Sequence, residues 1–181
     1  MEASPIQDGA KWGSTFMNQD AQFTRQPMVS FERLLPGPIE SVWDFLTDPR
    51  LLPAWFGDGT IEPSVGGKVS LMGGHIRGVV TQWEPPRRLA YTWNVFSSPD
   101  SKSPYPESYL NFVLEPQGGD VLMKLTHLPV LERFEKQNAM GWHTFLDLLE
   151  GAIRGESPKS REVYMRLNAE RYGVDLSNLV R

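Results

Sequence analysis

The chain has 181 residues, of which 40% are hydrophobic and 22% charged, with a formal net charge of −4 and a pI near 5.4. This composition is typical of a globular domain with a real core, and the acidic balance argues against a nucleic-acid partner. The absence of cysteine excludes disulfides and thiolate chemistry. We read no signal peptide at the N-terminus and no apolar run of about 20 residues that would cross a membrane. We therefore expect a soluble, cytoplasmic protein that binds neither nucleic acid nor membrane.

Three segments follow one another along the chain. Residues 1–25 are polar and lack a regular apolar pattern, so we expect a flexible or loosely docked N-terminal arm. Residues 26–155 carry alternating and helical apolar patterns, which predict one folded domain. Residues 156–181 are mostly charged and predict a C-terminal helical extension. The extension would either enlarge the body of the domain or serve a dimer contact, and the sequence leaves both open.

The domain is predicted to begin with a strand and two short helices. The strand runs from Met28 to Leu34, and Pro38 then begins a helix with one apolar stripe from Ile39 to Leu46. A second short helix restarts after Asp48, which we interpret as its N-cap. Its inward residues are predicted to be Leu52, Trp55 and Phe56.

A succession of about six short strands comes next, separated by glycine and proline turns. The strongest of these turns is Pro85-Pro86, because a proline pair fixes φ and removes two amide donors between two apolar runs. Short connections favour antiparallel neighbours, since parallel neighbours need long crossovers. The strands that the pattern locates cover residues 68–72, 75–83, 88–96, 108–115 and 121–127.

Alternation predicts which side chains face inward. Leu89, Tyr91 and Trp93 share one face of their strand. In the strand before it, Arg77 shares a face with Trp83, and periodicity alone does not say whether that face points in. An inward Arg77 would need a carboxylate or an anionic ligand, whereas an outward one would be solvated. We prefer the outward orientation.

Two further helices close the predicted fold. From Glu132 to about Arg154 the apolar residues form a broad helical stripe that includes Trp142, and Gly155 would end the helix. We expect His143 at the edge of this stripe. A last, charged helix would start at Ser157-Pro158 and end at Gly173. The fold class predicted is α+β, in the order β-α-α-β(about 6)-α plus an extra C-terminal helix, with a curved antiparallel sheet around the long helix.

These residues resemble a known family over about residues 26–155. The chain is similar to the activator-of-heat-shock-ATPase-like (Aha-type) domains of the START-like, helix-grip superfamily, also labelled SRPBCC. The motifs that carry the resemblance are Trp55-Phe56, Gly66-Gly67-Lys68, Gly78-Val79-Val80, Pro85-Pro86-Arg87-Arg88-Leu89, Tyr91-Thr92-Trp93, Leu125-Thr126-His127 and Gly141-Trp142.

The resemblance implies a cavity between the sheet and the long helix. Aromatic residues would wall such a cavity, although the same rings would equally well interlock as an ordinary core. We expect Trp55 and Phe56 near the mouth, with the adjacent glycines letting that segment move. The predicted ligand-binding residues are Trp55, Phe56, Tyr91, Trp93, Phe112, His127, Trp142, Phe145 and Leu149.

Three functions compete on this evidence. We place first the non-catalytic binding of a small apolar or amphipathic molecule, second a START-like cyclase or hydrolase, and third a co-chaperone-like interaction module. We assign no catalytic residue, but an enzyme would have only His127, Tyr91 and Arg77 to use. The three histidines are far apart and lack metal-ligand spacing, so we expect no metal and no cofactor. A homodimer is left open.

Overall fold

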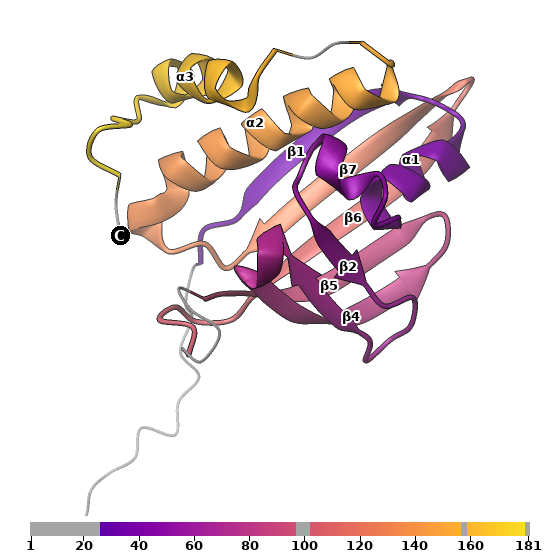
Figure 1. Ribbon diagram of the computed structural model, residues 1–181, viewed down its shortest axis with the longest axis horizontal. Coiled ribbons are helices and arrows are strands. Elements are labelled where there is room, and N and C mark those ends of the chain that lie inside the picture. Colours follow the sequence, from indigo (N-terminus) through magenta and orange to yellow (C-terminus); the bar gives the residue numbers. More distant parts are fainter. Residues whose placement is uncertain (1–25, 97–101, 157–158, 180–181) are drawn as a thin grey trace, which may run out of the picture.

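The computed structural model describes residues 26–96, 102–156 and 159–179. These residues form a seven-stranded sheet covered on one face by a long helix, α2 (Glu135–Ile153). A further helix, α3 (Arg161–Tyr172), packs against α2 on the side away from the sheet (Figure 1). The sheet, α2 and α3 thus form three layers. This arrangement confirms the predicted α+β helix-grip class.

All strand neighbours in the sheet are antiparallel. The order is β1-β7-β6-β5-β4-β3-β2. Strands β2 to β7 form a meander, and its last strand, β7, pairs with the first strand of the chain, β1. The predicted meander is therefore confirmed, but β2 was not located, because a three-residue strand that begins with a glycine shows no alternation. The strands are β1 (Val29–Pro36), β2 (Gly59–Ile61), β3 (Lys68–Leu71), β4 (Ile76–Glu84), β5 (Arg88–Val95), β6 (Ser108–Gln117) and β7 (Asp120–Leu128).

The proline pair makes the turn between β4 and β5 as predicted. Pro85 and Pro86 occupy the turn, and the amide of Arg87 donates to the carbonyl of Glu84 at 2.7 Å. Beyond the turn the predicted inward face of β5 is confirmed, since Leu89 and Tyr91 are buried and Trp93 is half-buried against the core. The same alternation buries two of the predicted ligand-binding residues, Phe112 of β6 and His127 of β7.

A β-bulge in β4 changes which side chains share a face of this strand. The register shifts between Val80 and Gln82, so the inward side changes by one residue. Trp83 consequently points inward and packs edge-on against Trp43, with ring centroids 5.1 Å apart. Its predicted place on the face of Arg77 is wrong. Arg77 itself is outward and half-exposed, as preferred.

The segment before β2 is one α-helix and one tight turn. Helix α1 (Ile39–Thr47) starts after Pro38 and buries Val42, Trp43 and Leu46 of its predicted apolar stripe. The expected second helix is only a 3-10 turn, η1 (Leu52–Ala54), and Asp48 does not cap it. The Asp48 carboxylate instead accepts from the amide of Arg50 at 2.8 Å. Trp55, whose burial was predicted, donates its indole N–H to the carbonyl of Phe45 at 2.8 Å.

The last helix begins later than predicted. The proposed start, Ser157-Pro158, lies outside the described residues, and the N-cap position of α3 is Ser160. Gly173 ends the helix in the left-handed conformation, with φ of 64°, as expected of a glycine C-cap. Because α3 buries Asn168 and Ala169 against the body, its charged pattern covers only the outer side. Helix α3 thus packs onto the body of the fold.

Candidate ligand pocket

A pocket of about 530 Å³ opens where the first half of α2 crosses one rim of the sheet. At this rim β5 and β7 end and β4 and β6 begin, so four strands contribute wall residues. Such a gap under a helix is typical of concave ligand sites in proteins. Its aromatic wall consists of Trp93, Tyr105, Phe134, Trp142 and Phe145.

The aromatic rings of the wall support one another. Trp142 lies 5.5 Å from Trp93 and 6.0 Å from Phe145, measured between ring centroids. Tyr105 meets Phe134 edge-on at 5.3 Å. These tilted and edge-on geometries are those that aromatic pairs prefer, and they hold the wall rigid.

A one-directional chain of hydrogen bonds runs behind this wall. Trp142 donates its indole N–H to Nδ1 of His127 at 3.0 Å. Since an indole only donates, Nδ1 must accept, and the hydrogen of the imidazole sits on Nε2. Nε2 then donates to Oγ of Ser108 at 2.9 Å, and the Ser108 hydroxyl donates to the carbonyl of Trp93 at 3.2 Å. Both nitrogens of His127 are therefore engaged.

Burial keeps His127 neutral. Loss of hydration lowers the pKa of His127 to about 4, and the nearby Asn138 side chain opposes this only in part. At neutral pH the ring has no charge, and its one lone pair is already used by Trp142. The arrangement makes His127 a structural link and a poor general base.

One polar atom of the wall, Asn138 Oδ1, lies near His127 but makes no hydrogen bond of good geometry within the described residues. This oxygen is buried. Buried carbonyl oxygens are nearly always satisfied by protein, water or ligand. Because Asn138 lines the pocket, its oxygen is placed to accept from a donor that enters it.

The predicted binding residues divide into two groups. Trp93, His127, Trp142 and Phe145 line the pocket. The other five lie in the core outside its wall: Trp55, Phe56, Tyr91, Phe112 and Leu149.

Three of the residues outside the wall had predicted roles of their own. Phe56 touches the pocket residues from behind, with its ring centroid 4.6 Å from that of Phe145, so it supports the wall rather than the mouth. The phenol of Tyr91 is enclosed, and burial raises its pKa far above the usual range, so it stays protonated. Arg77 is also outside the pocket. Its Nε donates to the carbonyl of Gly74 at 2.9 Å, and its guanidinium lies over the ring of Phe96.

Several wall residues were missed from the sequence. Asn138 stands four residues before Trp142 on the same helical face, so the stripe carried a signal that pointed to it. Ser108 pairs with Trp93 in the β5–β6 register, which only the hairpin geometry shows. Arg161 reaches the pocket through the packing of α3, and no local pattern indicates that.

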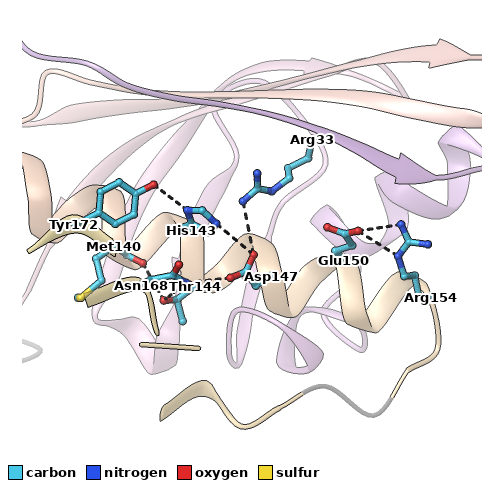
Figure 2. Close-up of polar contacts among 9 residues, drawn as sticks. All are labelled: Arg33, Met140, His143, Thr144, Asp147, Glu150, Arg154, Asn168 and Tyr172. Carbon is cyan, nitrogen blue, oxygen red and sulfur yellow. Dashed lines mark hydrogen bonds and ion pairs between the residues drawn. The ribbon is translucent and has the colours of Figure 1, made fainter. Parts of the chain in front are cut away.

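A second polar cluster, partly buried, joins α3 to α2 and β1. Figure 2 shows Tyr172 and Arg33 approaching His143 and Asp147 from different elements. The Asp147 carboxylate faces Nε2 of His143 at 3.6 Å, so Nδ1 accepts from the Tyr172 hydroxyl at 2.8 Å. Asn168 donates to Asp147 at 3.0 Å, and Arg33 lies 3.7 Å from it. These contacts anchor α3.

Burial also governs the titration of His143. Loss of hydration lowers the pKa of His143, while the negative charge of Asp147 acts in the opposite direction. The ring lies beside the apolar stripe and is nevertheless buried, because α3 covers the outer side of α2.

Neither a metal centre nor a membrane span is found in the part of the chain that the structure describes. No group of three or more acidic, histidine or cysteine side chains there would hold a metal ion. No helix within the described ranges is long and apolar enough to cross a bilayer.

The antiparallel sheet gripped around a long C-terminal helix defines a protein of the START-like, SRPBCC class. Within that class, the family described as Activator of Hsp90 ATPase homolog 1-like protein matches residues 36–154. The chain belongs to this family. Helix α3 and Arg161 lie beyond the matched residues.

Solved structures share this fold. CalU16 from Micromonospora echinospora is 25% identical, with a TM-score of 0.64, and the match covers 81% of this chain and 85% of CalU16. The protein encoded by BPP1335 of Bordetella parapertussis is 25% identical, with a TM-score of 0.63 and coverage of 87% and 91%. The Aha1 dimer of Colwellia psychrerythraea is 21% identical, with a TM-score of 0.57 and coverage of 70% and 96%, and shows the fold alone. No curated protein matches the chain.

Proposed function

We propose that the protein binds a small apolar or amphipathic molecule in the pocket under α2 and performs no chemistry on it. The observation that carries this proposal is the aromatic-walled space of about 530 Å³, into which Asn138 brings a buried oxygen that accepts no hydrogen bond from the described residues. Flat apolar groups would pack between Trp93, Phe134 and Phe145. A hydroxyl or amine on the ligand would donate to Asn138.

Binding is favoured over catalysis by the state of the three candidate catalytic residues. His127 is neutral and has both nitrogens engaged. Tyr91 and Arg77 are not among the pocket residues. An acid–base mechanism needs at least one proton-transferring group within hydrogen-bond reach of the substrate. This supports a carrier or sensor role and leaves the cyclase or hydrolase alternative without a working residue among the three.

Gly141 provides a direct test of occupancy. It lines the pocket, and a Cβ added there would meet no atom within 4 Å. We expect Gly141→Trp to fill the pocket and abolish binding of the neutral dye phenyl naphthylamine, while Gly141→Ala binds it as the unchanged chain does. Far-ultraviolet circular dichroism checks that both variants fold. Equal dye affinity in all three proteins would contradict the proposal, because the dye would then bind elsewhere.

The sequence left a homodimer open, and we propose nothing more specific about self-association. The dimer of the Colwellia protein is a property of that protein. Light scattering coupled to size-exclusion chromatography, with and without the dye, measures whether this chain forms a homodimer and whether the pocket depends on one.

A further inference from the structure

One pocket residue comes from outside the family match. The match ends at residue 154, whereas Arg161, the first residue of α3, stands in the pocket wall. The polar cluster of His143, Asp147 and Asn168 fixes α3 on α2, and thereby determines where Arg161 lies. The extension thus adds a cation to a pocket that the matched domain would form without it.

The geometry of Arg161 leaves it ready to bind an anion. Its guanidinium lies over the ring of Phe145, 4.7 Å from the centroid. A guanidinium stacked on an aromatic face is held flat, and the N–H donors along its edge remain available. Arg161 forms none of the ion pairs found among the described residues.

The charged side chains that line the pocket, among the described residues, have one sign. Among the described residues that line it there is no Asp or Glu, and Arg161 is the one side chain charged at every relevant pH. The adjacent Glu162 is exposed and does not line the pocket. Its pKa is lowered mainly by hydrogen bonds from its own backbone amide and from Ser160, and less by Arg161. The pocket therefore presents a positive potential to a ligand.

We infer that the ligand is an amphipathic aromatic anion whose oxyanion group, such as a carboxylate, pairs with Arg161 while its rings fill the aromatic wall. This inference rests on the proposed function, since it names the ligand class of the same pocket. The anionic group binds at the side of the pocket that α3 supplies, and the aromatic body lies against Phe145 and Trp93. A planar guanidinium suits a two-oxygen acceptor better than an ammonium does.

Two dyes that share one ring system test the inference. Anilinonaphthalene sulfonate carries an anion, and phenyl naphthylamine is its neutral counterpart. We expect the unchanged chain to bind the sulfonate more tightly. Arg161→Gln should lower the ratio of sulfonate to neutral affinity about tenfold, the effect of one charge-assisted hydrogen bond. Arg161→Lys should lower the ratio less. Arg166→Gln, on the same helix but outside the pocket wall, should keep it.

The outcomes separate the two proposals. The ligand class is supported if the unchanged chain binds both dyes and Gly141→Trp binds neither. The ratio of sulfonate to neutral affinity must also fall only in the Arg161 variants. The ligand class is overturned if the ratio of sulfonate to neutral affinity is unchanged in Arg161→Gln or falls equally in Arg166→Gln. The proposed function would then stand with a neutral ligand. If the unchanged chain binds neither dye, or Gly141→Trp binds both, the pocket function itself fails.

Discussion

Trp142 of α2 and His127 of β7 are joined by an indole N–H donated to Nδ1 at 3.0 Å. The bond ties the long helix to the sheet at the pocket wall, since both residues line the pocket. It also decides the tautomer of the imidazole, because the acceptor nitrogen cannot carry the hydrogen. The consequence is a histidine that holds two layers together and stays neutral.

Removal of this donor should destabilise the fold. Trp142→Phe keeps an aromatic ring but leaves Nδ1 of buried His127 without its partner, which costs about 2 kcal/mol of the free energy of unfolding. The pKa of His127 should rise, because the neutral ring loses the bond that favours it. Urea unfolding and a proton NMR titration measure these two effects.

A matched tryptophan provides the control for that variant. Trp83 packs on Trp43, and no hydrogen bond of its indole is found among the described residues. Trp83→Phe should therefore cost less than Trp142→Phe. Equal losses at the two positions would mean that ring size alone accounts for the cost.

Stability should fall as the solution becomes acidic, with His127 as one cause. Its pKa is about 4 in the fold and 6.5 in the unfolded chain. Between these values the unfolded chain binds more protons, so the contribution is complete above pH 6.5 and is lost as pH falls toward 4. A shift of this size corresponds to about 3 kcal/mol. Urea midpoints measured across this pH window test it.

Two substitutions identify the source of that pH dependence. His127→Gln should flatten the slope, whereas His75→Gln, at an exposed position, should keep it. His143 contributes a slope of the same sign, since burial lowers its pKa too. A slope as steep in His127→Gln as in the unchanged chain would assign the effect to His143 or to other groups.

The anchor of α3 should depend on Asn168. Its buried amide donates to Asp147 at 3.0 Å and to Thr144 at 3.3 Å. Asn168→Ala leaves both acceptors short of a donor and should cost about 1–3 kcal/mol. Hydrogen exchange should speed up in α3 more than in the sheet, and the sulfonate dye should bind less tightly. Asn178→Ala, which is exposed, should change neither quantity.

The bulged region of β4 should not tolerate a side chain at Gly78. A Cβ there would overlap the backbone carbonyl of Thr92 on the neighbouring strand. Gly78→Ala should lower the free energy of unfolding by about 1–3 kcal/mol through overpacking. Gly119→Ala is the matched control, since its Cβ would meet open space. Thermal unfolding of both variants decides whether the close approach matters.

Most of the fold was readable from the sequence because most strands keep an unbroken alternation. Leu89 and Tyr91 in β5 and Phe112 in β6 are buried as period two requires. The predicted orientation of Trp83 was wrong because one extra residue in β4 exchanges the inward and outward faces of the strand. An inserted residue leaves no signature in the pattern of apolar positions. The predicted start of helix α3 was wrong because Ser157 and Ser160 are the same residue type and are equally suitable as an N-cap.

Only some of the pocket residues could be predicted from the sequence, because periodicity does not show where a pocket ends along a helix. A stripe on α2 identifies Trp142 and Phe145 as inward, but Leu149 on the same stripe lies beyond the end of the pocket. Periodicity states which face is covered, and it does not state where along that face the covering layer stops. Arg161 illustrates the other limit, because its place depends on how a later helix docks.

The two indoles in the pocket wall offer an unlabelled optical readout. With ring centroids 5.5 Å apart and planes inclined at 53°, Trp93 and Trp142 are close enough for their electronic transitions to couple. Any guest that presses between or beside them changes their mutual angle, and with it the near-ultraviolet dichroic band. Crude extracts could be screened for the natural guest in this way, without a reporter group and before its chemistry is known.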